Sequence, residues 1–512
     1  MAEQPPQTPA RSPRPPALLD AVAPVVVLIG LIALTIVLFG VDASTGPLQI
    51  ALLTAAVFAG LVAFKNGHTV AAVRDAAIGG VTSALGAVFI LLAVGALIGA
   101  WNLSGTIPTI VSYGLGLLNP TIFYVAVAII CALVGAVTGS SWTTAGTLGV
   151  AFVGIAAVLK IPAPAAAGAV ISGAYLGDKM SPLSETTILV PSIVGGVTVQ
   201  DHIRGMVRTV GPAFVVALGI FLVMGLSASG ASTAETTKKA QDALATVFHI
   251  SPWCLLPLAL LVLLSLLRIP PFIAIFGTAI LSCAYAPFVQ PQIVQHFVGK
   301  PEQNTVLNAI EAAYRAMGEG FRLKTGNETI DTLFSGGGMV SMLTTVWLIF
   351  GALSFAAIME AAGFLDRLIS PLVARARTSG WLIATVIGTC FGLNLVAGDQ
   401  YVADVLPSRA YRSAFARAGL QPRMLSRTVE DSGTVTSPLV PWNSCGAYMA
   451  GVLGVPTIEY LPYAFFNIAN PLLAMLFGFI GLGVDRLPTA KADTGVAAVP
   501  AAARARGRPT VQ

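Results

Sequence analysis

Charged side chains are the scarcest feature of this sequence. The 512 residues include 28 Lys and Arg and 23 Asp and Glu, so that 10% are charged, whereas soluble chains carry about 25%. Apolar residues make up 55%, and the mean hydropathy is +0.82. So few charges cannot cover the surface of a soluble protein of this length, and the same composition excludes a disordered chain or a coiled coil.

The few charges are also unevenly spread. In the stretch 76–177 the only charged residue is Lys160. Since a helix crosses a bilayer in about 20 apolar residues, this stretch alone could cross four or five times. A membrane β-barrel would instead show short segments of alternating polarity. The sequence therefore predicts an all-α polytopic membrane protein.

Several chemical signatures are missing. The five cysteines are scattered through apolar stretches, and the four histidines are equally dispersed, so neither a metal site nor a disulfide is indicated. The basic clusters are not interleaved with aromatic residues, which argues against nucleic-acid binding. No G-x-x-x-x-G-K-[ST] motif occurs, so a nucleotide-driven activity is not indicated. We expect no enzymatic activity and no cofactor.

Gaps between charges and breaks at Gly and Pro predict about 10 to 13 transmembrane helices. Short apolar segments near 105–118, 163–176 and 186–199 are typical of broken helices or re-entrant hairpins. An amphipathic helix is expected around 306–321. The expected organisation is a disordered tail (1–20), a first transmembrane repeat (21–228), connecting helices with an amphipathic loop (229–335), a second transmembrane repeat (336–485) and a disordered tail (486–512).

Both tails are basic. Positive charge next to membrane spans is retained on the cytoplasmic side, so we expect both termini in the cytoplasm and an even number of crossings of the cytoplasmic membrane. The lipid bilayer is thus an expected partner of the chain.

Two segments carry carboxylates next to broken apolar helices. Asp178 and Asp431 are each followed by a hydroxyl-rich stretch that contains Ser-Pro-Leu. Proline removes a backbone donor and frees carbonyl oxygens. Carboxylate, hydroxyl and carbonyl oxygens are the ligands that Na⁺ requires, and a buried carboxylate can also carry a proton. We therefore expect Asp178 and Asp431 to bind Na⁺ and H⁺ in turn.

A third carboxylate, Asp399, ends another apolar run and would complete or tune this site. Asp178 and Asp431 are about as far apart in the sequence as Gly139 and Gly398, which suggests a duplicated unit of the kind that forms transporter repeats. Further ligand candidates are Ser181, Glu185, Thr186, Ser437 and Asn443. The alternative is structural: such residues also cap helices or bond across a bundle.

Long segments of the chain resemble the NhaC-type Na⁺/H⁺ antiporter family, which includes sodium-coupled malate/lactate exchangers. The resemblance rests on residues 138–144, 172–187, 398–401 and 425–446, with further likeness at 94–101 and 326–331. It covers roughly residues 20 to 485. The chain differs from the family pattern at two positions: Asp is usual where this chain has Glu185, and Asn is usual where it has Ile188. Both differences change the oxygen ligands on offer and therefore bear on the preferred ion.

The resemblance implies an antiporter of the ion-transporter superfamily, with inverted repeats and helical hairpins, that exchanges Na⁺ or Li⁺ for H⁺. The main alternative keeps this fold and exchanges small carboxylates such as malate and lactate. Homodimers are common in this architecture, although the sequence shows no interface signature. An intramembrane aspartyl protease is disfavoured because its Gly-x-Gly-Asp signature is absent, and a passive channel would not need buried carboxylates at helix breaks.

Overall fold

The computed structural model describes residues 13–117, 119–227, 234–300, 304–325, 331, 334–375 and 378–487. Within these ranges the chain is helical, and its only β pairing consists of isolated bridges, Phe321 with Gly336 and Leu420 with Arg486. The prediction of an all-α membrane protein is confirmed. Most of the two predicted tails lies outside the described residues, as does most of the segment 326–331.

The first half of the chain contains long helices and several short ones between them. Its helices are α1 (Leu18–Phe39), η1 (Gly40–Thr45), α2 (Pro47–Lys65), α3 (Val70–Ser83), α4 (Leu85–Leu103), α5 (Thr106–Leu117), α6 (Phe123–Thr138), α7 (Ser141–Thr144), the π-helical turn η2 (Ala145–Gly149), α8 (Val150–Val158), α9 (Ala163–Met180), α10 (Glu185–Val194) and α11 (Val199–Ser227).

The second half continues with a similar mixture. Its helices are α12 (Ala234–Val247), η3 (Pro252–Leu255), α13 (Leu256–Leu266), α14 (Pro271–Val289), α15 (Pro291–Val298), α16 (Thr305–Gly318), α18 (Met339–Ala361), α19 (Phe364–Arg375), α20 (Ser379–Val396), α21 (Gln400–Ala410), α22 (Arg412–Arg417), α23 (Pro422–Glu430), α24 (Gly433–Thr436), η4 (Ser437–Leu439), α25 (Ser444–Leu453), α26 (Thr457–Tyr460), η5 (Leu461–Tyr463) and α27 (Phe465–Ile480).

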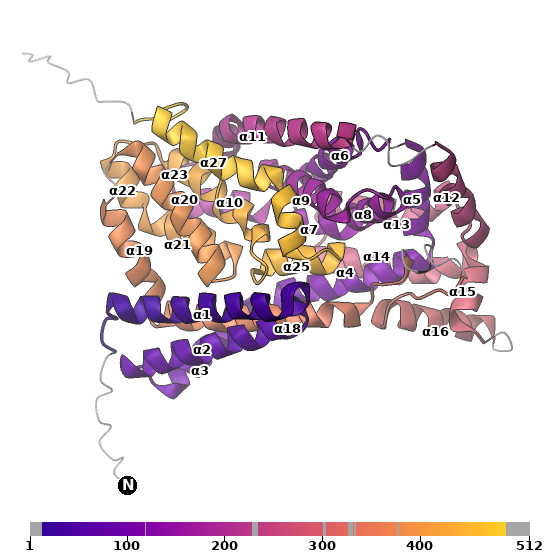
Figure 1. Ribbon diagram of the computed structural model, residues 1–512, viewed down its shortest axis with the longest axis horizontal. Coiled ribbons are helices and arrows are strands. Elements are labelled where there is room, and N and C mark those ends of the chain that lie inside the picture. Colours follow the sequence, from indigo (N-terminus) through magenta and orange to yellow (C-terminus); the bar gives the residue numbers. More distant parts are fainter. Residues whose placement is uncertain are drawn as a thin grey trace, which may run out of the picture.

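The helices pack into two groups. The peripheral group is formed by α1, α2, α3, α4, α14 and α18, in which α18 packs on α2, α3 and α4. The inner group is formed by α6, α9, α10, α11, α20, α21, α23, α25 and α27, in which α6 packs on α9 and α11 on α27. Figure 1 shows α1, α2 and α18 running side by side below the inner group.

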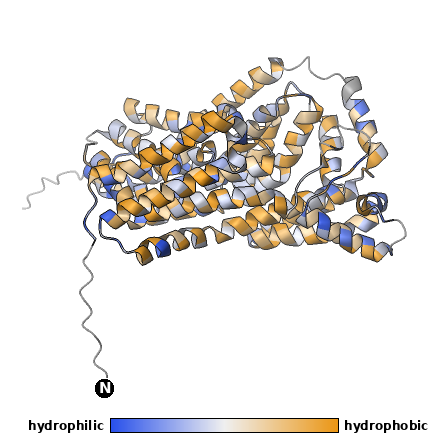
Figure 2. Cartoon of the chain, turned by 60° about the horizontal axis from the view of Figure 1, so that its bottom comes forward, coloured by the Kyte–Doolittle hydropathy of each residue, from blue (hydrophilic) through white to orange (hydrophobic). Residues whose placement is uncertain are grey.

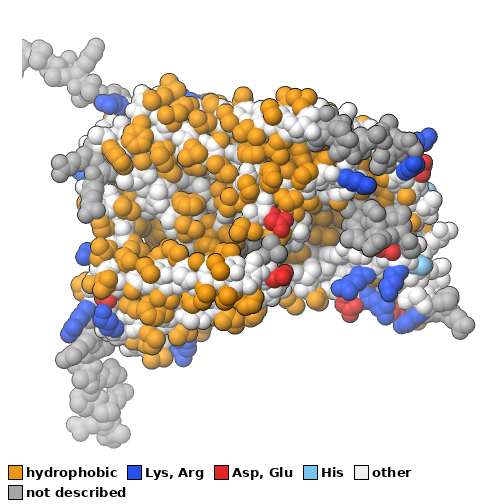
Figure 3. Space-filling model, in the orientation of Figure 1, with side chains coloured by type: hydrophobic (Ala, Val, Ile, Leu, Met, Phe, Trp, Pro, Cys, Tyr) orange, Lys and Arg blue, Asp and Glu red, His pale blue; other side chains and the backbone are white. Residues whose placement is uncertain are grey.

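The outer surface is suited to a bilayer. Among the described residues, eight helices are long and apolar enough to cross a membrane, or up to ten if two bent helix pairs each count as one span. The long outer helices are mostly hydrophobic (Figure 2), and Lys and Arg gather at the two ends of the face in Figure 3 with hydrophobic side chains between them. The chain is thus a multi-pass membrane protein.

Helix α1 begins and α27 ends at the same end of the molecule, at the left of Figure 1. A salt bridge of 2.7 Å joins Lys65 to Asp20 near the start of α1, and Arg423 bonds Asp485 just after α27. We call this the terminal end of the molecule. An arrangement with both ends on one side agrees with the expected even number of crossings.

The expected helix breaks and the amphipathic helix are present, with shifted boundaries. The amphipathic segment forms α16, which packs on α4, α14 and α15. The segment expected at 163–176 forms a longer helix, α9, whose last turn holds Asp178 and Lys179. The helix α11 begins with a polar segment at Val199, before its apolar part. In α9 the added turn is held by interior partners, since Asp178 bonds Ser141 and Lys179 bonds Asp431.

Candidate functional site: an acidic cavity at four helix breaks

A cavity of about 1020 Å³ lies between the peripheral and inner groups. The peripheral group contributes the α3–α4 junction, part of α18 and the turn before α14, while the inner group contributes the breaks α6–α7, α9–α10 and α20–α21 and the start of α25. Among the described residues, four carboxylates line it, from Asp178, Glu185, Glu360 and Asp399, against one guanidinium, from Arg268. The cavity is therefore strongly acidic and suited to a cation.

Asp178 lies in the last turn of α9 and is only 7% exposed. Its Oδ2 atom accepts hydrogen bonds from the backbone N–H of Ser141, at 3.0 Å, and from the hydroxyl of the same residue, at 2.8 Å. Ser141 is the first residue of the span that runs to Val158. The positive end of this helix thus faces the carboxylate, an arrangement that favours bound negative charge.

Asp399 holds two helix starts together. Its Oδ1 atom accepts from the N–H groups of Tyr401, at 2.8 Å, and Val402, at 3.2 Å, and so caps α21. Its Oδ2 atom accepts from the hydroxyl of Ser444 in α25, at 3.3 Å. Asp399 therefore combines a position at the cavity with the structural role of an N-cap.

The breaks before α7 and α21 are built alike. Gly139 and Gly398 both adopt the left-handed conformation, with φ of +66° and +62°, which glycine reaches without steric cost. Each is followed by a residue whose side chain caps the next helix, Ser140 in the first break and Asp399 in the second. This local likeness agrees with the expected duplication, although the repeat boundaries themselves stay a prediction.

Asp431 lies in different surroundings from Asp178. It is fully buried and does not line the cavity. Its Oδ1 atom lies 2.5 Å from the ammonium of Lys179 and 3.1 Å from Nδ2 of Asn470, while its Oδ2 atom accepts from the Thr209 hydroxyl at 2.8 Å. The ammonium of Lys179 thus lies beside Asp431, where Na⁺ was expected to bind.

Asp178 and Lys179 direct their side chains to different places. Asp178 faces the cavity, whereas the fully buried Lys179 reaches Asp431 at the end of α23. Arg427, also buried, lies with its Nε atom 3.8 Å from Asp431. Hence the two carboxylates expected to share one sodium site do not share one set of partners.

Glu185 and Thr186 begin α10 and both line the cavity. Glu185 accepts a hydrogen bond from the Tyr401 hydroxyl at 2.5 Å, which joins α10 to α21. The Thr186 hydroxyl donates to the buried carboxylate of Glu430 at 2.8 Å. These contacts place both residues at the boundary between the cavity and the inner group.

The three remaining candidates bond within the protein and do not line the cavity. The Ser181 hydroxyl accepts from the N–H of Leu183, Ser437 donates to the carbonyl of Thr434, and Asn443 caps α25 through the N–H of Cys445. Their placement favours the structural role that was the alternative for such residues.

Several cavity residues were not singled out from the sequence. Ser141 and Ser444 hold the two cavity aspartates, and each lies within a segment that carries the family resemblance. Arg268 and Glu360 come from elements far from those segments, so no local motif could place them at the cavity. Lys179 was not singled out either, and the structure pairs it with Asp431.

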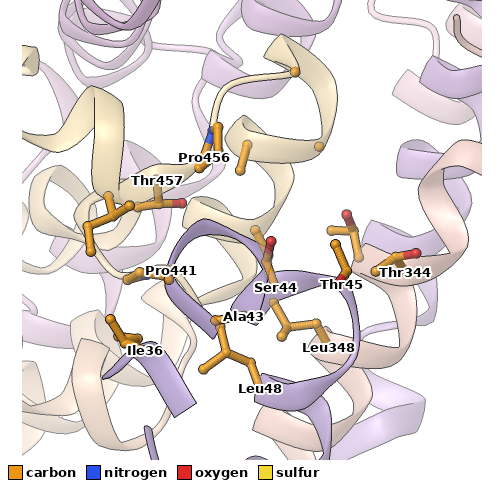
Figure 4. Close-up of a pocket in the computed structure, with 17 residues that line it drawn as sticks. Ile36, Ala43, Ser44, Thr45, Leu48, Thr344, Leu348, Pro441, Pro456 and Thr457 are labelled. Atoms are coloured by element: carbon orange, nitrogen blue, oxygen red, sulfur yellow. The ribbon is translucent and has the colours of Figure 1, made fainter. Parts of the chain in front are cut away.

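A smaller pocket of about 320 Å³ lies between η1, α18 and the segment α25–α26 (Figure 4). Its lining includes Ile36, Leu48 and Leu348, and none of its lining residues is charged. The described residues of this pocket therefore offer no carboxylate that could exchange a proton for a cation.

Comparison with known proteins identifies the family. A model described as "Na+/H+ antiporter family" matches residues 16–196 and 190–482, which together span most of the chain. The chain belongs to the Na⁺/H⁺ antiporter family. This result confirms the resemblance stated on the four helix-break segments, all of which fall inside the matched residues.

Relatives within this family differ in their named cargo. The Na(+)/H(+) antiporter NhaC of Alkalihalophilus pseudofirmus is 37% identical over 440 residues, which cover 86% of this chain and 91% of that protein. The malate-2H(+)/Na(+)-lactate antiporter of Bacillus subtilis is 34% identical and covers 85% and 90%, respectively. The arginine/ornithine antiporter ArcD of Halobacterium salinarum is 36% identical and covers 94% and 96%. All three are named as antiporters.

Proposed function

We propose that this antiporter exchanges Na⁺ for H⁺ across the cytoplasmic membrane and that Asp178 is the group that holds the two ions in turn. The observation that carries the proposal is the placement of the Asp178 carboxylate in the acidic cavity, at the start of the span Ser141–Val158. The family and the NhaC relative support the choice of ions.

The exchange follows from competition at one carboxylate. A proton and Na⁺ both neutralise the negative charge, and each excludes the other from the same oxygen atoms. The helix start and the Ser141 hydroxyl stabilise the charged form, so that the carboxylate can release its proton and accept Na⁺. Asp399, Glu185 and Glu360 raise the local concentration of cations in the cavity.

The role of Asp431 differs in this proposal. With Lys179 beside it, Asp431 is already neutralised by a cation of the protein, so Na⁺ would have to displace the ammonium to bind there. We assign the Na⁺ site to the cavity and a structural role to the Lys179–Asp431 pair, which joins helices of the inner group.

The charge of the cavity also bears on the carboxylate-exchanging alternative. Malate and lactate are anions, and a cavity lined by four carboxylates and one guanidinium would repel them unless cations bind first. The volume itself would admit an organic ion. The acidic lining thus favours a cation as cargo, whether Na⁺, Li⁺ or an organic cation of the kind named for the arginine/ornithine relative.

The orientation is inferred from charge. Arg412, Arg417 and Arg423 follow one another around α22 at the terminal end of the molecule. Since positive charge marks the cytoplasmic side, we place both termini there. The same assignment puts Glu360, at the end of α18, on the cytoplasmic side of the cavity.

The test uses the purified full chain in proteoliposomes with an imposed pH gradient and a pH-sensitive dye. We expect NaCl to collapse the gradient, LiCl to act in the same direction, and KCl, malate, lactate or arginine alone to have no effect. A gradient that responds to malate with lactate, or to arginine, but not to Na⁺ would overturn the proposal and select the corresponding cargo.

A further inference from the structure

Two buried titratable side chains, Glu430 and His202, take no part in the cavity. Both are fully buried, Glu430 at the end of α23 and His202 in the first turns of α11. Burying such groups is expensive, so they are expected to be paired or to serve a function. Their surroundings link the cavity to the terminal end of the molecule.

The first half of this link begins at the cavity. Ser184 and Thr186 both line it, and their hydroxyl oxygens lie 3.2 Å apart. Ser184 also lies beside the carboxyl group of Asp178. The Thr186 hydroxyl then donates to Oε1 of Glu430 at 2.8 Å. Hydroxyl groups thus connect the cavity aspartate to the buried carboxylate.

The second half leads away from the cavity. Nδ1 of His202 lies 2.9 Å from the hydroxyl oxygen of Ser426, which in turn lies 3.3 Å from the carbonyl oxygen of Arg423. Arg423 is partly exposed and pairs with Asp485 at 2.9 Å. The link therefore ends at Ser426, about one helical turn from the partly exposed side chain of Arg423 at the terminal end.

The two halves meet at a single gap. Nε2 of His202 and Oε2 of Glu430 lie 3.6 Å apart, and within the described part of the chain neither atom has a hydrogen-bond partner. A separation of 3.6 Å is too long for a hydrogen bond but is closed by a small side-chain rotation. Buried polar atoms without a hydrogen-bond partner destabilise a protein and are rare, so a purely structural role does not explain this pair.

We propose that Ser184, Thr186, Glu430, His202 and Ser426 form a proton path from the cavity to the terminal end, separate from the route that Na⁺ takes through the cavity. This proposal rests on the proposed Na⁺/H⁺ exchange. Imidazole can accept a proton at one nitrogen and release one from the other, so His202 can pass a proton between Glu430 and Ser426 once a small rotation closes the gap.

The same arrangement excludes Na⁺. A sodium ion needs several oxygen ligands at once, whereas the His202 end of the path is formed by an imidazole and lies near the guanidinium of Arg423. Protons can pass along such a chain because only one bond shifts at each step. Separate paths would let a proton leave while Na⁺ already occupies the cavity.

The charged residues on α11 and on the helices packed against it come from several elements. On α11 itself the charged neighbours in sequence are Asp201 and Arg204. The helix α23 contributes Glu430, Arg427 and, at its end, Asp431. The last turn of α9 contributes Lys179, the first turn of α10 contributes Glu185, and Asp485 follows α27. The helix α6 carries no charged residue.

The experiment compares two reactions of one protein in proteoliposomes. Na⁺-driven proton movement requires a proton path, whereas exchange of ²²Na⁺ for unlabelled Na⁺ requires only the cation site. We expect His202→Gln, which keeps hydrogen-bonding groups but cannot carry a proton, to lower proton movement at least tenfold and to leave Na⁺/Na⁺ exchange within about twofold of wild type. Ser426→Ala should show the same pattern.

The matched control is His296→Gln, because His296 is exposed on α15 and bonds only the carbonyl of Lys324. It should change neither reaction. The proposed path is wrong if His202→Gln retains Na⁺-driven proton movement, or if it loses both reactions in parallel, which would indicate a structural role. A wild-type protein that shows no Na⁺-driven proton movement would instead refute the proposed function.

Discussion

The ammonium of Lys179 and the carboxylate of Asp431 form an ion pair inside the protein, 2.5 Å apart and fully shielded from solvent. Lys179 follows Asp178 directly in α9, so one turn of helix presents a carboxylate to the cavity and an ammonium to the interior. The pair also joins α9 to the end of α23, and Thr209 adds a bond from α11. It therefore connects three helices of the inner group.

Removal of one partner from this pair should be strongly destabilising. Lys179→Met removes the closer cation and leaves the buried charge of Asp431 with Arg427, at 3.8 Å, as its remaining charged neighbour; removal of one partner from a buried pair costs about 3–5 kcal/mol. The double variant Lys179→Met/Asp431→Leu removes both charges and should regain most of that loss. The free energy of unfolding, measured in mixed micelles, tests this cycle. A loss in the double variant equal to the sum of the losses in Lys179→Met and Asp431→Leu would show that the pair itself adds nothing.

Asp178→Asn should abolish Na⁺-driven proton movement. Asparagine retains the size of the side chain and can still contact Ser141, but it carries no charge to exchange between Na⁺ and H⁺. The measurement is dye recovery in proteoliposomes, with insertion checked by the yield of folded protein. Asp366→Asn is the matched control, since Asp366 is exposed on α19. If Asp178→Asn retained transport, Asp178 would have a structural role only.

Ser141→Ala should weaken Na⁺ binding without abolishing transport. The substitution removes the hydroxyl that donates to Asp178 at 2.8 Å but leaves the backbone N–H at 3.0 Å. A hydrogen bond to a charged group contributes about 1.5–3 kcal/mol, so the KM for Na⁺ should rise roughly tenfold or more. Na⁺-dependence curves at fixed pH give this value. An unchanged KM would mean that the hydroxyl does not stabilise the sodium-binding form of the carboxylate.

Much of the fold and part of the site could be predicted from the sequence. The scarcity of charge and the long apolar runs were sufficient to predict an all-α membrane protein. Such a composition suits a lipid surrounding, in which helices satisfy all their backbone hydrogen bonds internally. Asp178 and Asp399 stood out since each charge lies beside a Gly- or Pro-containing break in an apolar segment. Both line the cavity in the structure.

The interior ion pairs could not be predicted in the same way. Arg427 lies in a strongly basic segment that is typical of a cytoplasmic loop, yet its side chain is 1% exposed. His202 precedes the apolar part of α11, so the first turns of that helix did not show the pattern of a span. Both residues are buried by contacts from elements more than fifty residues away, such as Gly483 and Ser426. Local patterns contain no information on such contacts.

Asp399 offers a test that separates charge from capping. Asparagine is as good an N-cap as aspartate, so Asp399→Asn should preserve stability, whereas Asp399→Ala should lose about 1 kcal/mol. If the charge also attracts cations, both variants should raise the KM for Na⁺. Stability and Na⁺ dependence are measured on the same preparations. Wild-type kinetics in the Asp399→Asn variant would show that Asp399 serves only as the cap of α21.

The segment after α27 should loosen from the inner group in acid. Burial raises the pKa of Asp485, but hydrogen bonds and charges from Arg208 and Arg423 outweigh it, so that the pKa lies below the usual 3.8. These bonds fix residues 483–487 against Gln421, whose N–H donates to the carbonyl of Asp485 at 3.0 Å. A carboxylate with a lowered pKa adds stability above its ordinary pKa, and this contribution disappears as the pH falls through the folded-state value.

Asp485→Asn should therefore be less stable than wild type at neutral pH by at most about 1 kcal/mol, because solvent screens this pair. The difference between the two proteins should shrink as the pH falls below about 4, where wild type is losing the same interaction. Hydrogen exchange at the backbone N–H groups of residues 483–487, compared between the two proteins at each pH from 7 downward, reports the loosening directly. A difference that persists unchanged at low pH would show that the carboxylate charge does not hold this segment.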